Sequence, residues 1–213
     1  MFRSLASVSL VLAATNIASA SLWTIGDSGN PDFYTVQDAL GNVLVHDGDV
    51  LHILTGTYGG FDTGDKAITL EPGNSPGVVT FTSNVRVRSS ATVNFEIAGR
   101  NATLPSGPTD YDVLLISGNL NVEGTLGIRL TNGFAPIYGD TFTIAHTTGT
   151  ISVSGPTDLP TLGGGLSWNV AVVSGSTWFG GSGSSLVVSV VPAPGAAALV
   201  GLAGLATTRR RRA

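Results

Sequence analysis

The feature that most constrains the fold of this chain is a succession of short apolar segments separated by turn-forming residues. Twelve segments rich in Val, Ile, Leu and Thr follow one another, and each is bounded by Gly, Asn, Asp or Pro. Such segments, at a spacing of roughly 8–15 residues, are typical of the strands of an all-β protein. The expected strands are Val50–Leu54, Ala67–Leu70, Val78–Phe81, Val85–Val87, Thr92–Ile97, Val113–Ile116, Leu120–Val122, Leu126–Leu130, Thr141–Ala145, Ile151–Val153, Ser167–Val173 and Leu186–Val190.

Helical periodicity is confined to one short stretch near the start of this region. Residues Phe33–Leu40 bring Val36, Ala39 and Leu40 to one face at helical spacing. We therefore expect one short helix there and strands in the rest of the body, which we take as residues 21–190.

Two all-β architectures fit this pattern. Several segments are almost wholly apolar or β-branched, as expected where stacked parallel strands pack inward, and polar turns such as Gly118-Asn119 and Gly139-Asp140 recur before them. These features favour a short parallel β-helix, or solenoid, of roughly six or seven coils with the helix as its N-terminal cap. A β-sandwich or jelly roll is the alternative, because strand number and length are compatible with it as well.

The first 20 residues have the three parts of a secretory signal peptide. Arg3 provides the charged start, Leu5–Ala14 the apolar run, and Ala18-Ser19-Ala20 the small-x-small cleavage site. We expect signal peptidase to cleave there, so that the exported protein begins at Ser21.

The C-terminal stretch, residues 191–213, has three parts as well. Pro192, Ala193, Pro194 and Gly195 precede an apolar run at residues 196–206, and the arginines Arg209, Arg210, Arg211 and Arg212 come last. As a helix the apolar run spans about 16 Å, well short of the ~30 Å hydrocarbon core of a membrane. The arginines favour a cytoplasmic location for this end while the body is exported. A simple tail anchor is the alternative to a sorting signal.

The order of Pro-x-Pro, apolar helix and Arg cluster resembles the PEP-CTERM sorting signal of exported Gram-negative bacterial proteins. That resemblance implies recognition by an exosortase, a membrane protease or transpeptidase, after transient anchoring of the C-terminal helix in the inner membrane. It also implies a final location in the cell envelope, at the outer surface or in the extracellular matrix. Ala193 stands where the family usually has Glu.

A second resemblance concerns the body. Residues 33–58, with Gly48-Asp49 and Gly56-Thr57-Tyr58, resemble the opening of a pectate-lyase-like right-handed β-helix, in which a short helix caps the first coil. Residues 70–97 and 111–134 resemble β-helical passenger segments of autotransporter-like surface proteins. Together these resemblances imply a β-helical surface protein.

Charge and composition exclude several functions. The chain has no Cys, which excludes disulfides, thiolate metal sites and a Cys nucleophile. All 14 acidic residues lie in the body, whereas five of the 10 basic residues lie in the terminal signals, which leaves the body at about −9. Such a body repels nucleic acid, and cations or neutral glycans are the compatible partners.

No catalytic motif stands out. His46 and His52 lie near Asp49, but their spacing matches no zinc motif, and His146 is remote from both. Arg86 and Arg88 alternate along one strand and share a face, where we expect them to pair with surrounding aspartates or face water.

Aspartates in Gly-rich turns of the first third suit Ca²⁺, but turn formation alone also explains them. These residues are Asp27, Asp32, Asp47, Asp49, Asp62 and Asp65. We expect no cofactor, and structural Ca²⁺ is the one weak candidate.

These observations predict an exported, non-catalytic structural protein of the envelope or extracellular polysaccharide matrix. One alternative is a glycan-binding module with Trp178 and Phe179 as a candidate stacking platform, although such aromatic residues, with Trp168, equally suit closure of the C-terminal end of the core. The other is a small polysaccharide-active enzyme that uses the region of Asp47, Asp49 and His52.

Overall fold

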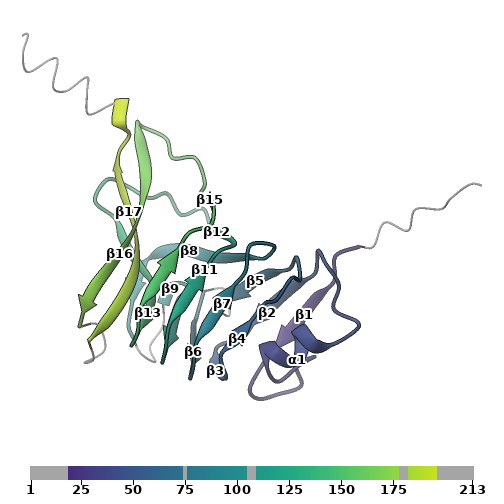
Figure 1. Cartoon of the computed structure of the whole chain (residues 1–213). Coiled ribbons are helices and arrows are strands. Elements are labelled where there is room, and N and C mark those ends of the chain that lie inside the picture. Colours follow the sequence, from purple (N-terminus) through teal and green to yellow (C-terminus); the bar gives the residue numbers. More distant parts are fainter. Residues whose placement is uncertain (1–18, 74–75, 105–108, 178–181, 196–213) are drawn as a thin grey trace, which may run out of the picture.

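The computed structural model describes residues 19–73, 76–104, 109–177 and 182–195. These residues form one short helix and a long series of strands (Figure 1). The first elements are β1 (Leu22–Ile25), α1 (Val36–Gly41), β2 (Val50–Ile53), β3 (Gly56–Tyr58), β4 (Phe61–Asp62), β5 (Thr69–Pro72), β6 (Val78–Phe81) and β7 (Val85–Val87). The remaining ones are β8 (Thr92–Ala102), β9 (Thr109–Tyr111), β10 (Val113–Ile116), β11 (Leu120–Val122), β12 (Thr125–Leu130), β13 (Thr141–Thr147), β14 (Ile151–Val153), β15 (Thr157–Asp158), β16 (Leu166–Ser176) and β17 (Gly183–Pro192).

The strands form three sheets in which most neighbours are parallel. The first sheet has the order β1-β2-β5-β8-β12-β15, with β9 added beside β8. The second has the order β16-β17-β13-β10-β6-β3, and the third has the order β14-β11-β7-β4. Antiparallel pairing is limited, among the described strands, to β8 with β9, β13 with β17, and β16 with β17. The prediction of an all-β protein is confirmed.

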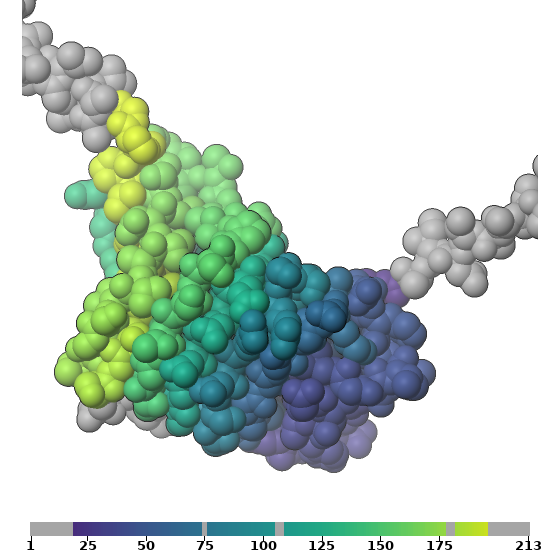
Figure 2. Space-filling model, in the orientation of Figure 1, coloured from purple at the N-terminus to yellow at the C-terminus, as the bar shows by residue number. Residues whose placement is uncertain are grey.

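Consecutive strands enter the three sheets in a fixed order. The triplet β2-β3-β4 is followed by β5-β6-β7, then by β8-β10-β11 and by β12-β13-β14, and each triplet adds one strand to every sheet. Figure 2 shows the result, because the colour of the surface changes gradually with sequence number along the body. Residues therefore contact mainly those of the preceding and following triplets.

Parallel register aligns the apolar side chains of successive triplets into rows. In the first sheet, Leu51 is the partner of Leu70, Leu70 of Val93, and Val93 of Leu126. All four side chains are buried, with exposures between 0% and 3%. In β2 and β5 alternate residues are buried, as the pleat of a strand requires.

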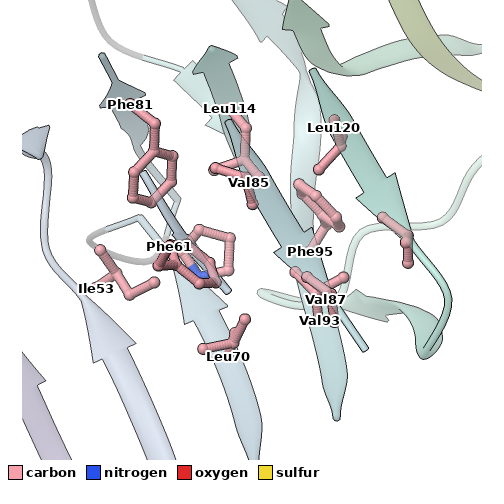
Figure 3. A pocket seen from close by; sticks show the side chains of 12 residues that line it. Ile53, Phe61, Leu70, Phe81, Val85, Val87, Val93, Phe95, Leu114 and Leu120 are labelled. Atoms are coloured by element: carbon pink, nitrogen blue, oxygen red, sulfur yellow. The ribbon is translucent and has the colours of Figure 1, made fainter. Parts of the chain in front are cut away.

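The interior between the sheets is apolar and closely packed. Figure 3 shows side chains from all three sheets, among them Ile53, Phe61, Leu70, Phe81 and Phe95, converging on one internal space. The rings of Phe61 and Phe81 lie 5.2 Å apart in an edge-on arrangement. The space left over is only about 10 Å³ and its lining offers no polar atom. Since a buried water needs polar partners, this space is a packing defect and not a ligand site.

The short helix α1 lies at the end of the molecule that carries β1 (Figure 1). Thr35 caps it by accepting a hydrogen bond from the amide of Asp38. Val36, Ala39 and Leu40 are the buried residues of the helix and belong to the core cluster. The helix predicted at residues 33–40 is confirmed, with its observed start a few residues later.

The opposite end is covered by β16 and β17, which continue the second sheet in antiparallel fashion. Trp168 on β16 packs its ring 6.3 Å from that of Phe142, and its indole nitrogen donates to the carbonyl of Pro160 at 2.8 Å. Phe134 and Tyr111 complete this aromatic cluster around Phe142. Closure of this end by Trp168 is therefore confirmed, while Trp178 and Phe179 lie outside the described residues.

Candidate functional site: a polar groove on the third sheet

A polar groove follows the third sheet and the corner that precedes it. Its volume is about 380 Å³ and it is open to solvent. Amide, carboxylate and guanidinium side chains dominate its lining, in contrast to the apolar interior on the other side of the same strands. The lining residues are Gly60, Phe61, Asp62, Ser83, Asn84, Val85, Arg86, Asn119 and Asn121.

A ladder of hydrogen bonds from side chain to backbone builds the corner beside the groove. The amide oxygen of Asn84 accepts from the backbone nitrogen of Asn119 at 2.8 Å, and that of Asn119 accepts from the backbone nitrogen of Thr150 at 2.9 Å. Ser83 accepts from the nitrogen of Gly60 at 3.0 Å. Gly60 has to be glycine, because a Cβ atom there would lie 2.1 Å from the carbonyl oxygen of Asn84.

Two ion pairs flank the ladder. Arg88 bonds both carboxylate oxygens of Asp62, at 2.6 and 2.8 Å, and Arg86 contacts Glu123 at 2.6 Å. The hydrogen bond from Arg88 lowers the pKa of Asp62 to about 2. The expected pairing with an aspartate is confirmed for Arg88, whereas the partner of Arg86 is a glutamate, Glu123.

The groove can bind through hydrogen bonds but offers no obvious chemistry. Asp62 is held ionised, so it cannot act as a general acid near neutral pH. Amide groups on neighbouring parallel strands lie about 4.8 Å apart, a spacing at which they can bond successive hydroxyl groups of a polar chain. Phe61 lines the groove but is buried, so its ring is not a stacking surface.

The residues considered for a hydrolytic or metal site do not converge. Asp49 is only 2% exposed and accepts hydrogen bonds from the backbone of Ser21 at 2.7 Å and of His46 at 2.9 Å, and from the indole of Trp23 at 2.9 Å. Burial alone would raise the pKa of Asp49, but these donors bring it below its usual value. His52 lies on the outer side of β2, with Nδ1 4.0 Å from a carboxylate oxygen of Glu71.

The other turn aspartates mostly cap backbone amides. Asp27 accepts from Thr57, Asp32 from Thr24, and Asp47 from Ala67. Within the described ranges, no group of three or more His, Asp or Glu side chains is placed to hold a metal ion. His146 is buried beside Ser185, with Nδ1 3.0 Å from its hydroxyl, and burial lowers the pKa of its imidazole.

One buried carboxyl group was not singled out from the sequence. Asp112 is 1% exposed and accepts from the backbone nitrogens of Gly77 at 3.0 Å and Glu96 at 2.7 Å. Burial raises the pKa of Asp112 to about 8. Both oxygens hold backbone segments together, which makes this residue a structural clamp.

The described part of the chain includes a portion of each predicted signal. Ala20 and Ser21 are exposed and precede β1, while Ala18 lies outside the described residues. Pro192 is the last residue of β17, and the backbone nitrogen of Ala193 donates to the carbonyl of Gly165 at 2.7 Å.

Pro194 and Gly195 end the described region, and Arg209, Arg210, Arg211 and Arg212 lie beyond it. The helices within the described ranges are all too short or too polar to cross a membrane. No protein-family model matches the chain, and a search of curated proteins finds no match to its sequence.

Proposed function

We propose that this chain is an exported, non-catalytic structural protein of the bacterial envelope or extracellular polysaccharide matrix, delivered by a signal peptide and an exosortase-type sorting signal. Signal peptidase and an exosortase would be its processing partners. In this proposal the terminal segments direct the chain to its location, and the β-rich body is what remains there.

The observation that carries the proposal is the position of the body relative to the two proposed signals. The first strand begins at Leu22, one residue after the proposed cleavage point, and β17 ends at Pro192, the first residue of the Pro-x-Pro motif. The buried hydrophobic residues of the described region all lie between Ile25 and Val190. Removal of both signals would therefore leave this core intact.

We further propose that the strand triplets are the coils of a short parallel β-helix. Parallel pairing and the repeated order of the strands support this architecture over a sandwich or jelly roll, which are built from antiparallel sheets. In this view α1 and the β16-β17 pair close the two ends, as solenoids require.

The surface charge of the body is consistent with a place in a hydrated matrix. Each of its four arginines is paired with a carboxylate: Arg86 with Glu123, Arg88 with Asp62, Arg100 with Asp140, and Arg129 with Asp158. Lys66 donates to the carbonyl groups of Asn42 and Val45. The excess charge is therefore negative, which favours interaction with cations and neutral polysaccharide over other anionic polymers.

The direct test is the intact mass of the protein recovered from the envelope and from the spent medium of the producing bacterium. The proposal predicts a species that begins at Ser21 and ends close to residues 192–195. A full-length C-terminus in the membrane fraction would make the chain a tail-anchored protein and overturn the sorting proposal. Replacement of all four terminal arginines by Gln is the matched variant and should abolish C-terminal processing.

A second candidate function is glycan binding in the polar groove. The observation that favours it is the alignment of Asn84, Asn119 and Asn121 beside an open groove of about 380 Å³. Because the groove lacks an exposed aromatic ring within the described residues, we expect weak binding dominated by hydrogen bonds.

Affinity electrophoresis in gels that contain the extracellular polysaccharide of the producing bacterium tests this candidate. Asn121→Ala should remove the retardation, because Asn121 lines the groove outside the supporting ladder. Asn169→Ala, on β16 and remote in sequence from the groove, is the control and should leave it unchanged. Equal retardation of both variants and the parent would rule out the groove as a glycan-binding site.

A further inference from the structure

The start of the folded body is attached to a buried carboxylate. The backbone nitrogen of Ser21 donates to Oδ1 of Asp49 at 2.7 Å, across 28 residues of sequence. Oδ2 of the same group accepts from the indole of Trp23 and from the backbone of His46, both at 2.9 Å. In the full-length chain the Ser21 nitrogen is a peptide amide. It carries no charge and has one proton to donate.

Hydrolysis of the Ala20–Ser21 bond changes the chemical nature of that nitrogen. One water molecule is consumed, Ala20 leaves with a carboxylate, and Ser21 acquires an amine that takes up a proton at neutral pH. The ordinary pKa of an α-amino group is about 7.7–8.0. A positive group would then lie at the position of the amide that already bonds Oδ1 of Asp49.

We propose that Asp49 is a built binding site for the α-ammonium group of Ser21, so that removal of the signal peptide converts a hydrogen bond into an ion pair that fastens β1 to the body. This inference rests on the proposed cleavage before Ser21. It goes beyond that proposal because it assigns the new terminus a specific partner and a stabilising role.

The surrounding contacts hold the terminus in place. The carbonyl oxygen of Ser21 accepts from the backbone nitrogen of Val50 at 2.8 Å, and the next residue, Leu22, is the register partner of Val50 on β2. The Ser21 nitrogen is therefore held by strand pairing and not by Asp49 alone. Ser21 itself is exposed, so the remaining protons of the ammonium group can be solvated.

Few other charged groups compete for this carboxylate. His46 lies on the same turn and its charge favours the ionised form of Asp49. Lys66 is engaged with the carbonyl groups of Asn42 and Val45, and Asp47 accepts from Ala67. Asp32 accepts hydrogen bonds from the backbone nitrogen and the hydroxyl group of Thr24, which lies on β1.

The ion pair has a defined pH window. The carboxylate raises the pKa of the amine in the folded state, so its contribution to stability is complete below about pH 7.7 and is lost as the pH rises through the raised value. The pKa of Asp49 lies below its usual value, so the contribution also fades when the pH falls below about 4. Between these limits the processed protein should be more stable than an unprocessed one.

The test compares two chains that end at Ala213 and differ by one residue at the start. One begins at Ser21 and the other at Ala20, and both are released in vitro from a removable leader. The Ala20 chain keeps the amide of Ser21 for Asp49 but moves the charge one residue away, which makes it the matched control. Both chains contain the whole described core, from Ile25 to Val190.

We expect the Ser21 chain to unfold about 2–4 °C higher than the Ala20 chain at pH 6.5, and the difference to vanish at pH 10.5. The α-amine of the Ser21 chain should also titrate at higher pH than that of the Ala20 chain, measured by NMR. Equal melting temperatures and equal amine titration would overturn the inference.

A separate measurement distinguishes failure of this inference from failure of the proposed processing. Intact mass of the exported protein reports whether the natural chain begins at Ser21. If it begins elsewhere, both the processing proposal and the role of Asp49 in the mature protein fail. If it begins at Ser21 while the two prepared chains behave alike, only the role of Asp49 fails.

Discussion

The turn before β2 and the middle of the body each contain a buried aspartate, and the two behave in opposite ways. Asp49 and Asp112 are 2% and 1% exposed, and both accept backbone hydrogen bonds that join distant segments. Yet the pKa of Asp49 lies below its usual value, whereas burial raises the pKa of Asp112 to about 8.

The first difference is depth: Asp112 lies deeper in the protein, so burial dominates its pKa, whereas Asp49 lies beside the exposed Ser21, and its donors and neighbouring charges decide the outcome. Asp49 has three N–H donors and a nearby histidine, His46, which together outweigh the cost of burial. Asp112 has two donors and faces the carboxylates of Glu96 and Glu71, which add to that cost. A carboxylate near the surface with three donors is therefore a clamp that is charged at pH 7, whereas a more deeply buried one with two donors is a clamp that is neutral at pH 7.

The largest expected effect is a loss of stability between about pH 4 and about pH 8, caused by the ionisation of Asp112. Its folded-state pKa of about 8 lies above the value of about 3.9 in the unfolded chain, so the folded state binds more protons between these limits. The free energy of unfolding should therefore fall as the pH rises from about 4 to about 8, by roughly 2–5 kcal/mol. Urea denaturation at pH 5, 7 and 9 measures this slope.

Asp112→Asn is the variant that isolates this contribution. Because Asn does not titrate, the pH dependence should become flatter. The NH2 side of the Asn amide cannot accept a hydrogen bond, so the backbone nitrogen of Gly77 or of Glu96 loses its acceptor and the variant should be less stable than the parent at pH 5. An unchanged slope would show that Asp112 is not the group responsible, and the contrast with Asp49 would then disappear.

The second prediction concerns Asp49→Asn, which replaces the charged carboxylate by a neutral amide. One side of the Asn amide carries hydrogens, so at least one of the donors from Ser21, Trp23 and His46 loses its acceptor. We expect a loss of about 2–4 kcal/mol in the free energy of unfolding at pH 7.

Asp47→Asn, two residues away, is the matched control for this prediction. Asp47 accepts one hydrogen bond, from the backbone of Ala67, in an exposed setting. Its substitution should cost less than about 1 kcal/mol. A similar loss in both variants would indicate that the turn as a whole, and not the buried carboxylate, is what matters.

Much of the fold could be predicted from the sequence because apolar runs and strands coincide. Each of the twelve expected segments overlaps an observed strand, and the helix buries the three residues expected of it. Most of the strands that escaped prediction lack such a run; the exception is β1 (Leu22–Ile25), which is apolar apart from Thr24. β15, Thr157–Asp158, is an exposed pair of polar residues, and β4 has Phe61 as its one apolar residue. Such short polar strands are defined by their pairing with a neighbouring strand, and this pairing leaves no local pattern in the sequence.

The candidate sites were harder to predict for the same reason. Asp112 accepts hydrogen bonds from the backbone of Gly77 and Glu96, which lie 35 and 16 residues away in the sequence. No local sequence pattern therefore indicates that it is buried. The hydrogen-bond ladder does have a counterpart in the sequence: Asn84 and Asn119 each come one residue before a strand of the third sheet, β7 and β11. That recurrence could have identified the corner beside the groove.

The third prediction tests whether the carboxylate of Glu96 contributes to the raised pKa of Asp112. Glu96 donates to Asp112 through its backbone nitrogen, so Glu96→Gln keeps that hydrogen bond and removes the repelling carboxylate. The pKa of Asp112 should fall, and the protein should gain a few tenths to about 1 kcal/mol of stability at pH 9. NMR titration of the Asp112 carboxyl carbon measures the first change. A rise in that pKa would contradict the explanation given for Asp112.

The smallest effect on stability is expected at Asp62, an exposed aspartate. Its pKa is lowered, as that of Asp49 is, but the cause is different. One guanidinium, that of Arg88, holds the pKa of Asp62 at about 2, and both side chains are about 40% exposed. In Arg88→Gln the pKa of Asp62 should return toward the ordinary value near 3.9, since no buried backbone donors replace the lost charge. Thermal unfolding should change little, because solvent-exposed ion pairs contribute weakly. A persistently low pKa would mean that the backbone nitrogen of Gly64, which bonds Oδ1 at 2.9 Å, and the charge of Arg86 suffice to keep the carboxylate ionised. Asp62 would then resemble Asp49 in mechanism as well as in the direction of its pKa shift.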